Sequence, residues 1–429
     1  MRRPLAIVIG LAGVICVAAC SSAGPATVPS STSTTSTTMP PRVEDNVLTI
    51  GVLLPASGPG ASAVGKSARA AVESAVKDAN AKGGVLGHDV VAYYRDEGSD
   101  TATAAVGWQQ LLDAHVDILI GPASSNIAIA LVPAIVDAGV AACSPSASAL
   151  ALDDFPDNGL FFRTIPSDSL QAEAMASVIE RTGDTSAAIV YIDDGYGRPF
   201  EKALQARLRA RNIAVNESVG FSVDDDEYAT EAARVINSGA GAIALIGDAE
   251  SGSRMLAELA AASKTEPHDI VLNDALRTPW SLSLLGSVSE AIRQRIVGVS
   301  PEVLTANTEL LADVAAAGTS GLFAGQASDC ANLFMLAAEK TGSSAASDIA
   351  AAIPDISSVG STCSTFAMCS ALISDGRSID FGGADGLLTI SQQGDPVSAR
   401  FDQFSFDDQG RDITTQLITV ASFGSSVGP

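Results

Sequence analysis

The sequence is poor in positive charge and in aromatic side chains. Its 429 residues include 25 Lys and Arg against 49 Asp and Glu, which gives a formal net charge of −24. A protein that follows nucleic-acid phosphates needs a basic face, so this charge excludes nucleic acid as a partner. Aromatic residues make up only 5 %, whereas hydrophobic residues as a whole make up 47 %. These numbers predict a folded protein whose core is built from Ala, Val, Ile and Leu.

Residues that commonly bind metals or perform hydrolysis are also scarce. The three histidines, His88, His115 and His268, lie far apart in the sequence, and there is no C-x-x-C motif that would indicate zinc. No G-x-S-x-G elbow is present, and no histidine lies near a candidate nucleophile. We therefore expect no metal, no cofactor and no enzymatic activity.

Long apolar runs are missing beyond the first twenty residues. The run over residues 4–17 follows two arginines and is short for a membrane span. It ends in Val17-Ala18-Ala19-Cys20, which resembles a bacterial lipoprotein signal whose Cys becomes the lipid-bearing N-terminus. A plain secretory peptide with an incidental Cys is the alternative. We expect residues 1–19 to be the signal and Cys20 to anchor the protein to a membrane of the cell envelope, outside the cytoplasm.

A low-complexity segment follows the signal. Between Ser21 and Pro41, 16 of 21 residues are Ser, Thr or Pro, a composition that cannot bury a core. Residues 20–45 are therefore predicted to be a lipidated tether, which can reach roughly 80 Å when extended. The folded body is expected to begin near Asn46.

Four cysteines remain in the body, as expected for an oxidising compartment. Cys363 and Cys369 are six residues apart in a Ser- and Thr-rich segment, and we predict a local disulfide between them. Cys143 and Cys330 are left to form a second disulfide or to remain buried thiols, and the sequence does not choose between these states.

Short apolar runs alternate with helical patterns through most of the body. Strands separated by helices of 10–15 residues indicate right-handed crossovers and parallel sheets with helices on both faces. This alternation of strands and helices is interrupted near residues 161–167 and then resumes, which predicts two sheets and hence two Rossmann-like lobes. The predicted strands are residues 47–54, 88–94, 117–120, 140–143, 186–192, 214–221, 242–246 and 270–272.

Hydroxyl-rich loops follow two successive strands of the first predicted sheet. Gly121-Pro-Ala-Ser-Ser-Asn126 opens a helix, and Ser144-Pro-Ser-Ala-Ser148 follows the next strand. Ligands of such sheets bind at the carboxyl ends of strands, where hydroxyls and free N–H groups suit an anion such as a carboxylate. Serine and asparagine are also ordinary helix caps, but two such loops on neighbouring strands favour a binding site.

The order and spacing of motifs over residues 47–415 resemble the leucine/isoleucine/valine-binding type of periplasmic solute-binding protein, which serves ABC importers. The motifs are Pro55-Ala-Ser-Gly58 with Gly65, Asn80-Ala-Lys-Gly-Gly-Val-Leu-Gly87, Asp96-Glu-Gly-Ser-Asp100, the two serine loops, Asp194-Gly-Tyr-Gly197, Asp380-Phe-Gly-Gly-Ala-Asp-Gly386 and Gly394-Asp-Pro396.

The resemblance implies an α/β fold of periplasmic binding protein type I, with two lobes joined by a three-segment hinge. The implied first lobe is residues 46–166 and 276–388, and the second is residues 167–275 and 389–424. The resemblance further implies a monomer that traps one small molecule and passes it to the permease subunits of an ABC transporter.

The resemblance also implies ligand-binding positions. Ser125, Ser146 and Ser148, with Ala147 in the same loop, match first-lobe positions that hold an amino acid's carboxylate and amine, and Tyr196 matches an aromatic of the second lobe. The family's second-lobe acid falls on Ser251, so Asp248 or Glu250 is expected to replace it. If neither does, the ligand need not carry an amine and could be an amide, a short carboxylic acid or a polyol.

The expected function is transport of an amino acid, most simply of the branched-chain type. Two other functions are alternatives to it. The same two-lobed protein could report its ligand to a signalling partner. Residues 60–67 also match the G-x-x-x-x-G-K-S phosphate loop of NTPases, but residues 55–59 separate this match from its strand, whereas a phosphate loop leaves its strand at once. Export from the cytoplasm, where nucleotides are abundant, also disfavours the NTPase.

Overall fold

The computed structural model describes residues 45–421 except 59–63, 226, 264–267, 278–287, 304–307, 320, 385, 387, 408 and 410. The predicted signal, Cys20 and nearly all of the predicted tether lie outside these residues. None of the helices in the described part of the chain combines the length and apolar character that crossing a bilayer requires.

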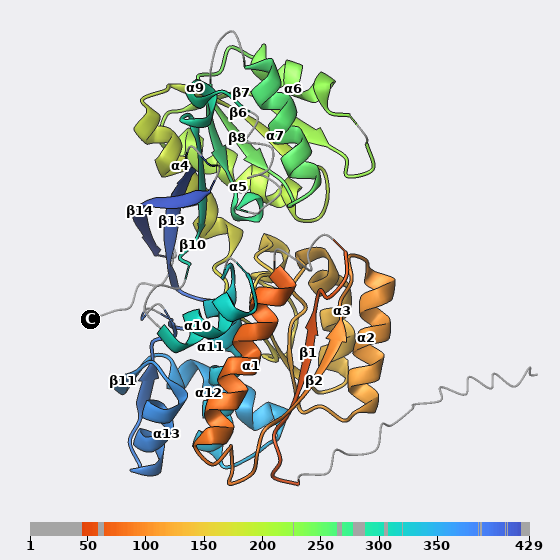
Figure 1. Ribbon diagram of the computed structural model, residues 1–429, viewed down its shortest axis with the longest axis vertical. Coiled ribbons are helices and arrows are strands. Elements are labelled where there is room, and N and C mark those ends of the chain that lie inside the picture. The colour runs from red at the N-terminus through yellow and green to blue at the C-terminus, as the bar shows by residue number, and fades with distance from the viewer. Residues whose placement is uncertain are drawn as a thin grey trace, which may run out of the picture. The chain divides into compact units, whose positions relative to one another are not determined.

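The first lobe is built on five parallel strands in the order β2-β1-β3-β4-β5 (Figure 1). Side chains alternate along β1, so that Ile50 and Val52 pack on one face of the sheet and Leu53 packs on the other. The strand bounds are β1 (Thr49–Leu54), β2 (Val91–Asp96), β3 (Ile118–Ile120), β4 (Ala141–Ser144) and β5 (Phe161–Arg163).

Helices from both ends of the sequence cover this sheet. Helices α2 (Thr101–Asp113) and α3 (Ser125–Asp137) pack on the face of Leu53, and α1 (Lys66–Ala81) packs with α11 (Ala324–Thr341) on the other. Asp100 caps α2, because its carboxylate accepts hydrogen bonds from the N–H groups of Ala102 and Thr103. The remaining elements of this lobe are α10 (Thr308–Ala316), α12 (Ala346–Ile356), α13 (Phe366–Ser374), η2 (Leu150–Leu152), β11 (Ser361–Cys363) and β12 (Ile379–Phe381).

The second lobe is built on seven strands in the order β14-β13-β10-β9-β8-β6-β7. Strands β6 to β10 are parallel, and β13 is antiparallel both to β10 and to the edge strand β14. The strand bounds are β6 (Ser186–Ile192), β7 (Ala214–Phe221), β8 (Ala242–Ile246), β9 (Asp269–Leu272), β10 (Ile296–Pro301), β13 (Ser398–Phe406) and β14 (Asp412–Ala421).

Helices cover both faces of the second sheet. One apolar cluster joins it to α4 (Asp168–Thr182) and α5 (Gly197–Ala210), and another joins it to α6 (Ala229–Ile236), α7 (Ser251–Ala262) and α9 (Glu290–Arg293). A short turn, η3 (Asp274–Leu276), follows β9. The predicted α/β class with two lobes is thus confirmed.

The chain passes between the sheets three times, and one predicted boundary is wrong. The passages follow β5, β10 and the segment around Ile390, which is buried in the first-lobe core. The prediction returned the chain to the first lobe at residue 276, but β10 pairs with β9 and β13 in the second sheet. The return therefore comes after Pro301, because β10 completes the second sheet before the chain leaves it.

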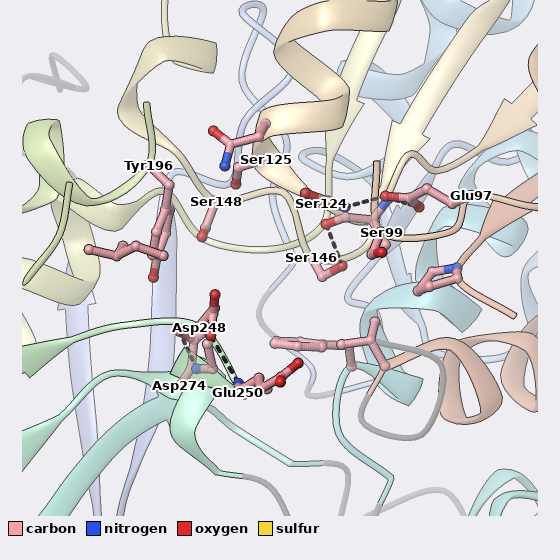
Figure 2. Close-up of a pocket in the computed structure, with 18 of the residues that line it drawn as sticks. Glu97, Ser99, Ser124, Ser125, Ser146, Ser148, Tyr196, Asp248, Glu250 and Asp274 are labelled. Atoms are coloured by element: carbon pink, nitrogen blue, oxygen red, sulfur yellow. Dashed lines mark hydrogen bonds between the residues drawn. The ribbon is translucent and has the colours of Figure 1, made fainter. Parts of the chain in front are cut away.

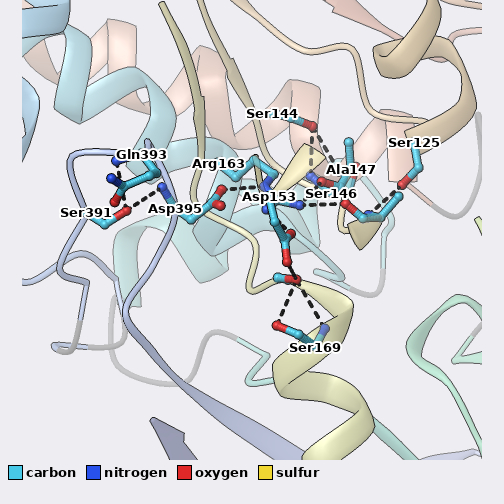
Figure 3. A network of polar contacts seen from close by, with 12 residues as sticks. Ser125, Ser144, Ser146, Ala147, Asp153, Arg163, Ser169, Ser391, Gln393 and Asp395 are labelled. Carbon is cyan, nitrogen blue, oxygen red and sulfur yellow. Dashed lines mark hydrogen bonds and ion pairs between the residues drawn. The ribbon is translucent and has the colours of Figure 1, made fainter. Parts of the chain in front are cut away.

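Arg163 ties the first and third passages together (Figure 3). Its side chain is fully buried at the end of β5, where Nε donates to Asp395 and Nη2 donates to Asp153, each at 2.6 Å. Ser167, in the first passage, donates its hydroxyl to the other oxygen of Asp153. This buried ion network fixes the segments from which the second lobe starts.

Two disulfides lie in the first lobe. The predicted bond between Cys363 and Cys369 is present, and Cys143 of β4 is bonded to Cys330 of α11 across 187 residues of sequence. The second bond resolves the alternative that the sequence left open and links the sheet covalently to a helix of the returning segment.

Candidate functional site

A pocket of about 530 Å³ opens between the loops at the carboxyl ends of the two sheets (Figure 2). This volume suits a small organic molecule. The first lobe contributes loops that follow β1 to β4, together with residues before α11. The second lobe contributes loops that follow β6, β7, β8 and β9. Both sheets thus present the strand ends at which α/β proteins bind their ligands.

The serine loops of the first lobe are held against each other by hydrogen bonds. The hydroxyl of Ser144 donates to the carbonyl of Pro122 at 2.5 Å, and Ser146 donates to the carbonyl of Ala123 at 2.9 Å. Gly121 lets the first of these loops pass close to β1, because a Cβ there would lie 2.0 Å from the carbonyl oxygen of Leu53. Ser125, Ser146 and Ser148 consequently present their side chains to one pocket.

Ala147 is placed differently from its neighbours. Its side chain is fully buried in the core and does not line the pocket, and its N–H donates to the hydroxyl of Ser144 at 2.9 Å. The ligand-binding role of Ala147 stays a prediction, and its side chain lies outside the described lining of the pocket. Within the loop, the residues on either side of it face the pocket instead.

Glu97 is a pocket residue that the sequence analysis did not single out. It is buried after β2, and its two carboxylate oxygens accept the N–H groups of Ala123 and Ser124, each at 2.7 Å. Burial raises the pKa of Glu97 to about 8, against the effect of these two hydrogen bonds. The amides before α3 are thus occupied by a carboxylate of the protein itself.

Tyr196 is the aromatic wall contributed by the second lobe. Its hydroxyl oxygen accepts a hydrogen bond from the side-chain amide of Asn273 at 2.9 Å, which leaves the phenol hydrogen available to another acceptor. Burial, together with the nearby carboxylates of Asp168 and Asp274, raises the pKa of Tyr196 well above its usual value. The phenol therefore stays protonated and can act as a donor.

Two buried carboxyl groups lie beside Tyr196. Asp274 follows β9 and lines the pocket, and Asp168 is fully buried at the start of α4. Burial, and for Asp168 also the proximity of Asp274, raises the pKa of both groups. No described residue forms a hydrogen bond of normal geometry with either oxygen of Asp168, although the Ser148 hydroxyl is near enough to lower its pKa.

Asp248 and Glu250, the predicted second-lobe acids, both line the pocket. One oxygen of Asp248 accepts the N–H groups of Glu250 at 2.9 Å and Ser251 at 2.6 Å, so Asp248 helps to cap α7. Figure 2 shows the side chain of Asp248 directed toward Ser148 across the pocket. Ser251, the position to which the family register pointed, is buried and does not line it.

A hydrogen bond connects the lobes at the rim of the pocket. The side-chain amide of Asn126, in the first turn of α3, donates to Asp194 at 2.9 Å. The other oxygen of Asp194 caps α5 by accepting the N–H groups of Tyr196 and Gly197. The segment that carries Tyr196 is thereby held to the first lobe.

The described part of the phosphate-loop match does not fit nucleotide binding. Gly60 to Ala63 lie outside the described residues. Ser67, which would have to reach a nucleotide-bound magnesium ion, is fully buried in α1. Within the described ranges, no group of three or more His, Cys, Asp or Glu is arranged to hold a metal ion.

Comparison with known proteins decides the family. A periplasmic binding protein family model matches residues 47–370. The chain belongs to the periplasmic binding protein family. Its relatives and fold neighbours identify it as a type I member of the Leu/Ile/Val-binding-protein kind. Proteins of this family are in general solute binders rather than enzymes and act outside the cytoplasm.

Two relatives match most of the chain. The chemotactic signal transduction system substrate-binding protein BasB of Halobacterium salinarum is 29 % identical over 82 % of this chain and 85 % of its own length. The Leu/Ile/Val-binding protein homolog 3 of Brucella melitensis is 26 % identical over 84 % of this chain and 92 % of its own length.

Solved structures share the fold. A solute-binding protein of an ABC transporter from Rhodopseudomonas palustris, in complex with p-hydroxybenzoic acid, has a TM-score of 0.70 at 20 % identity and covers 87 % of this chain and 97 % of that chain. The substrate-binding protein LivJ from Streptococcus pneumoniae, in complex with isoleucine, has a TM-score of 0.69 at 19 % identity and covers 87 % and 99 %.

Proposed function

We propose that this protein captures an α-amino acid between its two lobes and delivers it to the permease of an ABC importer. The observation that carries the proposal is the pocket itself, in which first-lobe hydroxyls face a tyrosine, the buried Asp274 and three further acids of the second lobe. Branched-chain amino acids, which the names of several relatives specify, are the first ligands to examine.

The two ends of an amino acid match the two walls of the pocket. The hydroxyls of Ser125 and Ser148 replace the water shell of the ligand's carboxylate, and Ser146, whose hydroxyl proton is donated to Ala123, lies beside them. The ammonium group lies against Asp274, with Asp168 behind it and the phenol of Tyr196 beside it. A buried carboxylate without a counter-charge is unfavourable by several kcal/mol, so an ammonium ligand stabilises this wall.

Ligand binding drives closure because only the closed form makes contacts from both lobes at once. The Asn126–Asp194 hydrogen bond is one contact that opening would break. The permease then recognises the closed form, and its cytoplasmic ATPases supply the energy for transport.

The double variant Ser125→Ala, Ser148→Ala tests the site. We expect amino-acid binding to weaken by roughly 1–3 kcal/mol, because hydrogen bonds to a charged group are lost. Calorimetric titration of the full-length protein measures this, with Ser374→Ala, an exposed serine of α13, as the control. Unchanged affinity in the double variant would reject the assignment of these serines.

Signalling is the second candidate function, favoured by the relative whose name describes a chemotactic signal transduction system. The same closed form would then be recognised by a signalling partner. Uptake of a labelled amino acid by cells with and without the protein separates the two roles. A loss of uptake supports transport, and unchanged uptake with a lost response supports signalling.

We also propose that Cys20 carries a lipid and that the protein acts as a membrane-tethered monomer. Fractionation of cells that express the full-length Cys20→Ala variant tests this. We expect the variant to move from the membrane fraction to the soluble fraction, and retention in the membrane would contradict the lipid anchor.

A further inference from the structure

We propose that the ligand carries a second positive charge on its side chain, so that the pocket prefers basic amino acids, such as lysine, to branched-chain ones. This inference rests on the proposed function and specifies the substrate class of the same site. It follows from the charges that line the pocket and from where they lie.

The pocket is lined by acids without any base. Among its described lining residues there are five carboxylates and no Lys, Arg or His. Arginines of adjoining segments are engaged elsewhere: Arg163 with Asp153 and Asp395, Arg198 with Asp193, and Arg277 with Asp402 and Asp412. Arg254 of α7 donates to the backbone carbonyls of Val223 and Asp225. None of the described lining residues thus supplies a counter-charge to these acids.

These acids are not equivalent. Asp194 and Asp248 accept N–H groups at the starts of α5 and α7, where the helix termini compensate part of their charge. Glu250 is different, because no described residue forms a hydrogen bond or an ion pair with its carboxylate. Its charge is therefore free to meet a ligand.

The acids also exceed what one ammonium group can neutralise. Asp274, with the fully buried Asp168 behind it, already faces the α-ammonium group in the proposed pose. Glu250 remains, whereas the raised pKa of Glu97 keeps that group protonated near neutral pH. A branched-chain ligand would leave Glu250 without a positive partner, whereas a basic side chain provides one.

The positions of these groups fit an extended side chain. Figure 2 shows Glu97 across the pocket from Tyr196, with Glu250 entering from the second lobe. Pro55, Leu322 and Phe323 add apolar surface to the lining. A ligand with its α-groups at the Tyr196 end would lay its methylene groups on this surface and bring a terminal cation toward Glu250.

L-Lysine and L-norleucine form a matched pair that isolates the second charge, because they share a four-carbon side chain and differ in the terminal ammonium group. Calorimetric titration of the full-length protein with each is expected to show lysine binding at least tenfold more tightly. Equal or tighter binding of norleucine would overturn the inference.

The variant Glu250→Gln locates the effect. We expect it to weaken lysine binding about tenfold and to change norleucine binding less than twofold, while Glu309→Gln, an exposed substitution on α10, changes neither. An unchanged lysine affinity in Glu250→Gln would refute the assignment of this residue.

The same titrations separate this inference from the proposed function. Binding of leucine or norleucine without a preference for lysine would reject the basic ligand and leave amino-acid capture standing. If the folded protein, verified by its thermal unfolding transition, binds no amino acid at all, both proposals fall.

Discussion

Glu97 shows how a single residue can hold a binding loop in place. Its carboxylate accepts two amides immediately before α3, and burial raises its pKa from 4.5 to about 8. The folded protein therefore retains a proton that the unfolded chain releases between these pH values. It follows that the contribution of Glu97 to the free energy of unfolding falls as the pH rises from about 4.5 to about 8.

The variant Glu97→Gln tests this pH dependence. In the ligand-free wild type, Glu97 should make the free energy of unfolding fall by up to about 1.4 kcal/mol per pH unit in this window. The variant Glu97→Gln should lack this contribution. Denaturant unfolding at several pH values measures it, with Glu309→Gln as the control. A pH profile of Glu97→Gln parallel to that of the wild type would contradict the raised pKa.

Asp274 is expected to be the residue on which ammonium binding depends most. Asp274→Asn should weaken amino-acid binding by about 2 kcal/mol or more, since a buried charge partner is removed. Because burial raises the pKa of Asp274 and an ammonium ligand favours its ionised form, wild-type affinity should decrease on acidification at a higher pH than for an exposed aspartate.

Titration calorimetry at two pH values measures both effects, and Asp355→Asn, an exposed substitution on α12, is the control. If Asp274→Asn binds like the wild type, the ammonium group lies elsewhere in the pocket.

Sequence reasoning reached some of these residues and missed others for physical reasons. The serines that follow β3 and β4 could be predicted, because the ends of successive parallel strands lie side by side. The same rule applied to β9 would have found Asp274, which follows Leu272 by two residues. Asp168 gave no such signal, because it begins a helix after a passage between lobes.

At the scale of elements, the disulfide between β4 and α11 is the strongest covalent constraint of the first lobe. In the chain-entropy model, loss of a bond that spans 187 residues destabilises by about 5 kcal/mol, and loss of one that spans 6 residues by about 2 kcal/mol.

We therefore expect the variant Cys143→Ala, Cys330→Ala to lower the free energy of unfolding more than Cys363→Ala, Cys369→Ala does. Denaturant unfolding of both variants measures the difference. A larger loss in the second variant would show that the short bond, rather than the link from the sheet to α11, dominates stability.

The alternation of strands and helices was predictable up to β9, because each parallel crossover is a local pattern. The placement of β10 was not. It lies between β9 and an antiparallel strand that begins about a hundred residues later, at Ser398, so the pairing that fixes its sheet is not a local property.

At the scale of the whole molecule, the two lobes matter because each supplies only part of the pocket. The first lobe contributes hydroxyls and Glu97, and the second contributes Tyr196 and most of the acids. The three passages between lobes, with the buried Arg163 network at two of them, position these half-sites. The sequence predicted the two lobes, but the excess of acid became visible only when distant loops were brought together.

A crystal structure of the full-length protein grown with a mixture of L-amino acids tests the central claim most directly. The account predicts one amino acid in the pocket, with its ammonium group within hydrogen-bonding distance of Asp274 and its carboxylate on the hydroxyls of Ser125, Ser146 or Ser148. An amino acid bound outside the pocket, or a pocket that contains only water at saturating concentration, would contradict it.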